Sequence, residues 1–376
     1  ENYIINVIYE DTKNNLWVGT EESGLMRINS DGKISKKYIP DEKNPNSISG
    51  VSITEIYQDS KDNLWIGTYE NGLNKYNYDK NNFISFQYHP ESQEGLQGNT
   101  ILSLFEDREG NLWIGTSNGI NYFNLNLSSF HHYQCRKNGP EGLSNDDIWE
   151  TYQDREKNII WIGTADGGLN KFVPDSECFY SYKHDENDPT SLASNTVYSV
   201  YQDSKNNFWV GTSKGLDLFD PESESFRHFK KGNGPTSLIN NIIGCIYDDS
   251  HGILWIGTNR GLHKFKYRNN KFVKLQNSDE KSSYLVNNTI YTIYEDSRNI
   301  LWVGTSGGGL YRYNRRTASF KNYEHVTADT TSISSNIIIS ILEDSYGNLW
   351  IGTARGLNKF LRAKEEFKAY YEIDGL

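Results

Sequence analysis

Short apolar runs separated by polar turn residues follow one another along the chain. In residues 98–144, apolar letters gather at 99–107, 111–116, 120–124 and 130–133, and Gly, Asn, Asp and Ser stand between them. Runs this short, rich in Ile, Leu, Tyr, Phe and Trp, predict β-strands joined by tight turns. No window shows a helical period over the length of a helix. We therefore expect an all-β chain whose structural unit is four antiparallel strands.

The strongest feature of the pattern is a W-[IV]-G-T motif that recurs at intervals of 46 to 48 residues. Its tryptophans are Trp17, Trp65, Trp113, Trp161, Trp209, Trp255, Trp302 and Trp350. A near-constant period of this size indicates a repeat architecture. We expect one domain, residues 1–376, built from eight units: 1–49, 50–97, 98–144, 145–193, 194–239, 240–286, 287–334 and 335–376.

The motif also predicts how the units pack. In the stretch LWIGT at 64–68, alternation places Trp65 and Gly67 on one face of the strand and the other three residues on the opposite face. Both faces are largely apolar, so the sheet has to be covered on both sides, and the abundant cover is another unit. The indole would fill the space between sheets, and the glycine would let a ring or a neighbouring chain come close. Four-stranded sheets stacked in this way predict a β-propeller, with a superhelical solenoid as the less favoured alternative.

An aspartate precedes most of the motif tryptophans by six residues, as Asp59 precedes Trp65. In the fourth unit Asp154 precedes Trp161 by seven residues. Because an Asp side chain can accept hydrogen bonds from backbone amides two residues on, we interpret it as the organiser of a hairpin turn. A calcium loop would need more carboxylates at regular spacing and a bidentate Glu.

Composition narrows the classes of function. The chain has a net charge of −11 without a basic cluster, which argues against nucleic acid as a partner of this segment. No apolar run approaches the roughly 20 residues that span a bilayer. Neither a signal peptide nor an initiator Met is visible, so we expect a mature or trimmed segment. Cys135, Cys178 and Cys245 are odd in number and widely spaced, which favours separate thiols over a disulfide framework or a zinc site.

Candidate binding residues fall on the loops, where a rigid scaffold usually carries them. In a propeller, the loops between second and third strands share one face with the loops that join successive units. The second-to-third-strand loops supply the candidates Tyr69, Glu70, Asn118, Asp166, Lys214, Arg260 and Arg355. A position five residues before the turn aspartate adds Tyr198 and Tyr291, and Trp149 occupies the same place in the fourth unit.

These residue types together suit a carbohydrate. Flat, amphipathic aromatic rings can stack on sugar rings, while Asn, Asp and Arg can bond hydroxyl groups. The competing interpretation is that the charges are merely solvated and the rings plug the central opening.

An enzyme is the first alternative function. A sialidase-like glycosidase would need an arginine cluster and a Tyr–Glu pair, whereas arginine is thinly spread and no unit stands out. A lyase would need a His or Tyr base beside a metal, and the eight histidines are dispersed. A protein-interaction scaffold is the second alternative. We expect no catalytic residue, no metal and no cofactor in this segment.

The stretches EDREGNLWIGTSNGINYFN and EDSYGNLWIGTARGLNKF resemble the two-component regulator propeller repeat, and the likeness extends over all eight units. The resemblance implies the periplasmic sensor region of a hybrid two-component regulator that binds an oligosaccharide. It further implies adjoining sensor and kinase domains, a membrane helix and a DNA-binding domain elsewhere in the parent chain.

Propellers of this family usually have seven blades. Eight units here mean either an eight-bladed ring, which we favour because whole units stand at both ends, or seven blades plus one from an adjoining propeller. We expect the signal to reorient one propeller or subunit against another, as a homodimer would allow.

Overall fold

The computed structural model shows a β-propeller of eight four-stranded antiparallel blades, each made of four consecutive strands. This confirms the predicted fold class and the eight-bladed alternative. The structure describes residues 3–29, 33–90, 95–125, 129–133, 142–232, 234, 237–267, 271–274 and 284–371. Cys135 lies outside these ranges, while Cys178 and Cys245 are free thiols.

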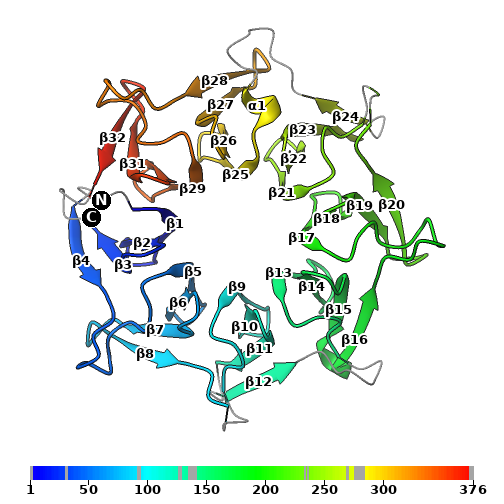
Figure 1. The fold of residues 1–376 in the computed structure, drawn as a ribbon, viewed down its shortest axis with the longest axis horizontal. Coiled ribbons are helices and arrows are strands. Elements are labelled where there is room, and N and C mark those ends of the chain that lie inside the picture. Colours follow the sequence, from blue (N-terminus) through cyan, green and yellow to red (C-terminus); the bar gives the residue numbers. More distant parts are fainter. Residues whose placement is uncertain are drawn as a thin grey trace. The chain divides into compact units, whose positions relative to one another are not determined.

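Within each blade the strands follow one another in chain order (Figure 1). The first strands are β1 (Ile5–Glu10), β5 (Ile53–Gln58), β9 (Ile101–Glu106), β13 (Ile148–Gln153), β17 (Val197–Gln202), β21 (Ile243–Asp248), β25 (Ile290–Glu295) and β29 (Ile338–Glu343). The second strands, which carry the motif, are β2 (Leu16–Thr20), β6 (Leu64–Thr68), β10 (Asn111–Thr116), β14 (Ile160–Thr164), β18 (Phe208–Thr212), β22 (Leu254–Thr258), β26 (Leu301–Thr305) and β30 (Leu349–Thr353).

The third and fourth strands complete the blades. The third strands are β3 (Leu25–Ile28), β7 (Leu73–Asn77), β11 (Gly119–Asn124), β15 (Leu169–Val173), β19 (Gly215–Asp220), β23 (Gly261–Lys266), β27 (Leu310–Asn314) and β31 (Gly356–Leu361). The fourth strands are β4 (Ile34–Tyr38), β8 (Asn82–Phe86), β12 (Ser129–Tyr133), β16 (Cys178–Tyr182), β20 (Ser225–Phe229), β24 (Lys271–Lys274), β28 (Ser319–Tyr323) and β32 (Glu366–Tyr370).

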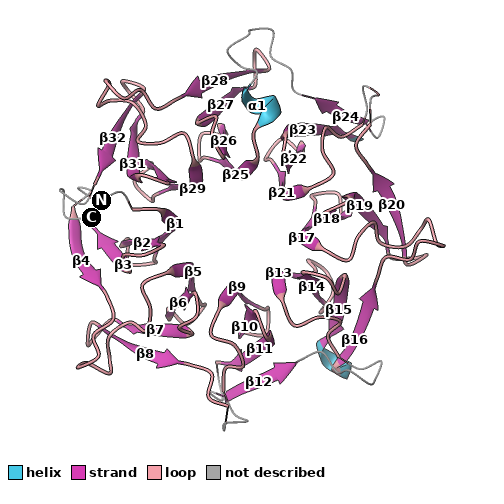
Figure 2. Cartoon of the chain, viewed as in Figure 1, coloured by secondary structure: helices cyan, strands magenta, loops and turns pink. Residues whose placement is uncertain are grey.

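Helical structure is limited to short pieces in the described part of the chain (Figure 2). They are the 3-10 turn η1 (Pro174–Ser176) and the four-residue helix α1 (Tyr284–Asn287). Neither these nor any other helix in the described ranges has the length and apolar character needed to cross a membrane.

The chain separates into two compact units, Tyr9–Val200 and a second one made of Glu1–Ile8 with Tyr201–Leu376. In the unit 9–200, the first strands β5, β9 and β13 are neighbours, and β9 contacts both of the others. In the other unit, β21, β25 and β29 are arranged in the same way.

The motif tryptophans pack between blades, as predicted. Every residue from Leu64 to Thr68 is buried, so β6 is covered on both faces. Trp65 meets Phe123 of the following blade at a ring-centroid distance of 5.4 Å, and the two planes are 67° apart. The same edge-on contact with a third-strand ring of the next blade joins Trp17 to Tyr76, Trp113 to Phe172, Trp209 to Phe265, Trp255 to Tyr313 and Trp302 to Phe360.

The glycine of the motif admits the first strand of the next blade. A Cβ atom on Gly67 would lie 2.7 Å from Cγ2 of Ile101, and one on Gly304 would lie 2.8 Å from Cγ2 of Ile338. A Cβ atom on Gly352 would lie 2.8 Å from Cγ2 of Ile5, so β1 packs against the eighth blade. Of the two predicted roles for this glycine, close approach of a neighbour is therefore the one found.

Candidate functional site

A β-bulge in the first strands decides which side chains leave the sheet. In β13, Ile148 pairs with Thr164 and Glu150 with Gly163, so that Trp149 is passed over. A bulged residue is not held by a ladder pair, and its side chain can be aimed away from the sheet. The residues passed over in this way are Thr54, Leu102, Trp149, Gly244, Tyr291 and Ile339. Each of these residues lies five residues before the turn aspartate of its unit, which is the position that the sequence analysis singled out.

Two of the predicted residues come together in the unit 9–200. The rings of Trp149 on β13 and Tyr198 on β17 have centroids 4.8 Å apart and planes inclined by 46°. Trp149 is 41% exposed, whereas the other eight tryptophans, all within the described ranges, are buried. The pair therefore forms an aromatic surface that is accessible to solvent on the first strands of adjacent blades.

Two carboxyl groups that the sequence analysis missed lie on first strands of the same compact unit, and Glu150 directly follows Trp149 in β13. Glu55 on β5 and Glu150 on β13 are both partly accessible to solvent. Burial among protein atoms raises the pKa of Glu55 to about 7. Burial, and then repulsion by Glu55, raises the pKa of Glu150 to about 8. The residue after Glu150, Thr151, donates a hydrogen bond of 3.1 Å to Ser103 on β9.

A signal for this carboxyl pair was present in the sequence. Glu55 and Glu150 occupy the position after the bulge, which is Ser103, Ser199, Cys245, Thr292 or Ser340 in five other units. An acidic residue in the middle of an otherwise apolar first strand is unusual, because burying a carboxylate is costly. The electrostatic coupling between blades two and four could not be inferred without the arrangement of the strands.

Each loop candidate lies on the turn between the second and third strands of its own blade. Tyr69 is 52% exposed after β6, and the Glu70 amide donates to Thr100 Oγ1 at 3.2 Å. Asp166 is exposed between β14 and β15. The Asn118 side chain donates to the Gln97 carbonyl at 2.6 Å, so its amide serves the structure of the loop.

The remaining candidates belong to the second compact unit. Lys214, Arg260 and Arg355 have exposed side chains on equivalent turns. Their backbone amides donate to the motif threonine hydroxyls at 3.0 to 3.1 Å. Tyr291 is 50% exposed on β25. The structure thus brings Trp149 and Tyr198 into contact and places the other candidates on separate turns or strands.

The loops that lead into the first strands are held by buried polar side chains of the third strands. Asn74 Oδ1 accepts the Ser49 amide at 3.0 Å, and the Asn74 amide donates to Ser49 Oγ at 2.8 Å. The same amide-to-side-chain bond is made by Asn121, Asn170, His263 and Asn358. Sequence reasoning missed these residues, although a polar letter recurs at the second or third place of the third strand. Their effect is to fix the loop that leads into the first strand in these five blades.

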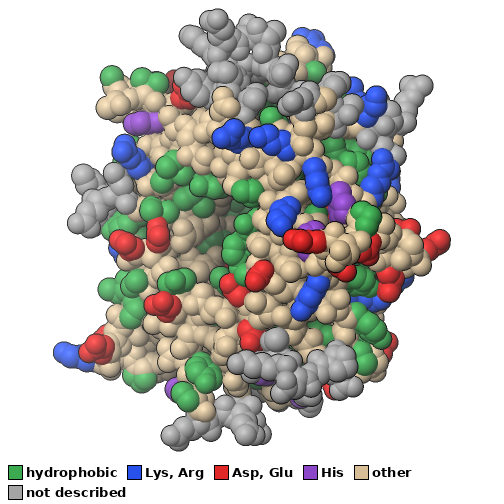
Figure 3. All heavy atoms as spheres, turned by 45° about the vertical axis from the view of Figure 1, so that its right-hand side comes forward, with side chains coloured by type: hydrophobic (Ala, Val, Ile, Leu, Met, Phe, Trp, Pro, Cys, Tyr) green, Lys and Arg blue, Asp and Glu red, His purple; other side chains and the backbone are tan. Residues whose placement is uncertain are grey.

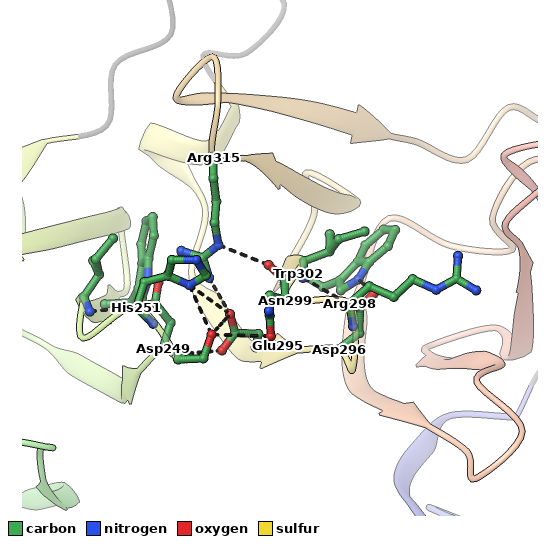
Figure 4. A network of polar contacts seen from close by, with 12 residues as sticks. Asp249, His251, Glu295, Asp296, Arg298, Asn299, Trp302 and Arg315 are labelled. Atoms are coloured by element: carbon green, nitrogen blue, oxygen red, sulfur yellow. Dashed lines mark hydrogen bonds and ion pairs between the residues drawn. The ribbon is translucent and has the colours of Figure 1, made fainter.

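The opposite ends of the blades carry a polar network (Figure 4). Arg315 bridges Asp249 and Glu295, and the Ser250 amide also donates to Glu295. Burial acts to raise the pKa of Asp249, but hydrogen bonds from Trp255 and Arg315 outweigh it, and the pKa is lowered. The same arrangement recurs one blade further on, where Arg362 bridges Asp296 and Glu343.

Charge on the surface is mixed. Acidic and basic side chains both occur on the face drawn in Figure 3. In the part of the chain that the structure describes, no group of three or more His, Cys, Asp or Glu side chains is placed to hold a metal ion. The chemistry available at the first strands is therefore that of aromatic faces, hydroxyls and two carboxyl groups of raised pKa.

Comparison with known proteins defines the class. Seven segments of the chain match the two component regulator propeller family: residues 1–22, 47–70, 95–118, 191–214, 237–260, 284–307 and 332–355. The chain therefore belongs to the two component regulator propeller family. None of the segments covers the W-[IV]-G-T motif of the fourth unit, which has the additional turn residue. No curated protein matches the chain.

Solved structures share the fold. The extracellular domain of the hybrid two component system BT3049 from B. thetaiotaomicron is 20% identical over 100% of this chain, with a TM-score of 0.51. The chain spans 66% of that domain's length. The computationally designed Ika8 protein is 11% identical, with a TM-score of 0.63 over 98% of this chain and 97% of that one. The Dos1 propeller is 13% identical, with a TM-score of 0.56 over 93% of this chain and 90% of that one.

Proposed function

We propose that this chain is the extracytoplasmic ligand-binding part of a hybrid two component regulator and that it binds an oligosaccharide at Trp149 and Tyr198. The observation that carries the proposal is the solvent-accessible contact between these two rings. Trp149 is the one tryptophan of the nine, all of them described, whose ring has an exposed surface available for stacking. Aromatic residues with an apolar face and a polar tip are common in binding sites for amphipathic ligands.

Glu150, the residue after Trp149 in β13, supports a neutral sugar as the ligand. At neutral pH, a carboxyl group with a pKa of about 8 is largely protonated and can both donate and accept hydrogen bonds. Sugar hydroxyls have the same double character. A site of this kind pairs with hydroxyl groups and does not need a charged ligand.

The family and the fold of the BT3049 domain support the sensor role. In this proposal the ligand signal passes to adjoining sensor and kinase domains of a longer parent chain, in the periplasm, with a homodimer as the signalling assembly. Reorientation of one propeller or subunit against another would carry the signal.

The test is titration calorimetry with a panel of neutral oligosaccharides and their parent polysaccharides. We expect saturable binding without turnover, weakened about tenfold or more by Trp149→Ala and by Tyr198→Ala, because a stacked aromatic anchor contributes on the order of 1–3 kcal/mol. Tyr180→Ala is the matched control, since Tyr180 is 51% exposed on the outer strand β16. An affinity that neither Trp149→Ala nor Tyr198→Ala changes, or the absence of saturable binding by every member of the panel, would contradict the proposal.

A glycosidase is the second candidate, because two carboxyl groups near a sugar site are the usual catalytic pair. Such enzymes keep one carboxyl ionised and the other protonated at working pH. Here the pKa of Glu55 is raised to about 7 and that of Glu150 to about 8, so a pH between the two leaves one carboxyl mostly ionised and the other mostly protonated, and this is the observation that favours the enzyme as second candidate. Chromatography of the calorimetry mixtures decides the matter, since released product would support the enzyme.

A further inference from the structure

A cavity of about 420 Å³ opens between the seventh and eighth blades in the unit that contains residues 201–376. Its lining includes Arg298 from the turn after β25, Tyr346 from the turn after β29, and Lys359, Arg362 and Lys364 from β31 and the turn that follows it. The volume falls within the range of about 300–1,000 Å³ that is usual for small-molecule sites. Four of these five side chains are cationic, in a chain with a net charge of −11.

Two carboxylates lie next to this cavity, and one arginine offsets half of their charge, so the four cations of the lining remain in excess. Arg362 donates to Asp296 at 2.8 Å and to Glu343 at 2.7 Å, and its Nε donates to the Gly347 carbonyl. One arginine thus faces both acidic groups and has little remaining capacity for a ligand. Lys359 lies over the ring of Trp350, with its Nζ 5.1 Å from the ring centroid.

Arg298 and Lys364 are different, because they are exposed and, within the described residues, neither side chain has a carboxylate partner. Figure 4 shows the Arg298 side chain extending away from the ion pairs that Arg315 makes with Asp249 and Glu295. Tyr346, on the next blade, is 62% exposed, the highest value among the large exposed hydrophobic side chains described. The cavity therefore combines two available cations with an accessible aromatic face.

We propose that this cavity binds a sugar ring that carries an anionic group, such as a uronic acid or a sulfated monosaccharide. Arg298 and Lys364 hold the anion, since charge-assisted hydrogen bonds to carboxylate or sulfate are the strong ones and a guanidinium can make two of them. Tyr346 contacts the ring. A bare inorganic anion would leave this aromatic face unused. The site is separate from Trp149 and Tyr198, and neither proposal depends on the other.

The experiment is titration calorimetry of the whole chain with galacturonic acid, galactose 6-sulfate and neutral galactose. We expect the two anionic sugars to bind, galactose not to bind, and the affinity to fall as ionic strength rises. The comparison of the two anions tells whether a carboxylate or a sulfate is preferred. Either preference supports the site.

Variants locate the binding. Arg298→Gln and Lys364→Gln should each weaken it about tenfold or more, as the loss of one charge-assisted contact implies, and Tyr346→Ala should weaken it as well. Arg316→Gln removes an exposed cation outside the cavity and should leave the affinity unchanged, as should Trp149→Ala. Equal binding of galactose, binding that ignores Arg298→Gln, or binding of an acidic peptide but of neither anionic sugar would overturn the proposal.

Discussion

At the scale of single residues, one aspartate in each of seven blades organises both a turn and a core. Asp59 is 3% exposed and accepts the amides of Lys61 and Asn63 at 3.0 and 2.8 Å. Its second oxygen accepts the indole N–H of Trp65 at 2.8 Å. The same indole bond joins Trp17 to Asp11, Trp113 to Asp107, Trp209 to Asp203, Trp255 to Asp249, Trp302 to Asp296 and Trp350 to Asp344. The carboxylate thereby fixes the indole that fills the space between blades.

Replacement of this aspartate should therefore destabilise the fold far from any ligand. We expect Asp59→Ala to lower the free energy of unfolding by about 2–4 kcal/mol, because it leaves buried N–H groups of the turn and of Trp65 without an acceptor. Urea denaturation followed by tryptophan fluorescence measures the change. Asp79→Ala, at an exposed aspartate of the β7–β8 turn, should change the unfolding free energy by less than about 0.5 kcal/mol. Equal effects of the two substitutions would contradict this account.

At the scale of elements, the first strand of a blade both packs against the preceding blade and exposes a side chain to solvent, and the β-bulge assigns these roles to different residues. Residues in the ladder, such as Ile101, press into the glycine of the preceding blade. Residues at the bulge, such as Trp149, leave the ladder and become accessible. In a regular strand Trp149 would have its own ladder partner, whereas the bulge leaves it without one.

The contact between glycine and neighbouring strand gives a prediction for strand substitutions. Gly67→Ala places a Cβ atom 2.7 Å from Ile101 Cγ2, and this overpacking should cost about 1–3 kcal/mol of unfolding free energy. Gly244→Ala is the control in a first strand, because its Cβ would meet only the Ile290 carbonyl oxygen, at 3.7 Å. The control should be neutral or slightly stabilising, since Ala restricts the unfolded chain. Thermal unfolding of both variants decides between packing and a general effect of alanine in strands.

At the scale of the whole molecule, the coupled glutamates make stability depend on pH. Their folded pKa values of about 7 and about 8 lie above the ordinary value of 4.5. The folded state therefore binds more protons than the unfolded state between pH 4.5 and about 8. Stability contributed by this pair is present at the acidic end of that window and is lost as the pH rises through the folded pKa values.

Glu150→Gln should remove much of this dependence. Between about pH 5 and about pH 8, the unfolding free energy of the variant relative to the wild type should rise by roughly 1–3 kcal/mol, less than the full shift because the carboxyl is partly solvated. Chemical denaturation at both pH values measures the change. Glu186→Gln, at an exposed loop residue, should keep the dependence of the wild type. A variant at position 150 that follows the wild-type curve would show that the pair is not the cause.

The sequence predicted the repeated features and missed those that depend on which blade lies beside which. The motif around Trp65 recurs, so its burial, its glycine and its turn aspartate could be inferred from alternation and turn chemistry alone. Trp149 and Tyr198 were also singled out in the sequence, because large aromatics in a variable position are conspicuous, and their role as a binding site stays a prediction. Glu55 and Glu150 interact across an intervening blade, and Arg362 reaches Asp296 of the preceding blade. Such pairings become visible only once the strands have positions in space.

The contact between the motif glycine and a β-branched side chain of the next blade recurs from blade to blade, as in Gly67 with Ile101 and Gly352 with Ile5. A gene segment of about 48 codons, copied whole, would thus encode a fit to the unit before it and to the unit after it. Propellers of this kind can therefore lengthen by duplication without inventing a new interface, and the permitted increment is the entire repeat.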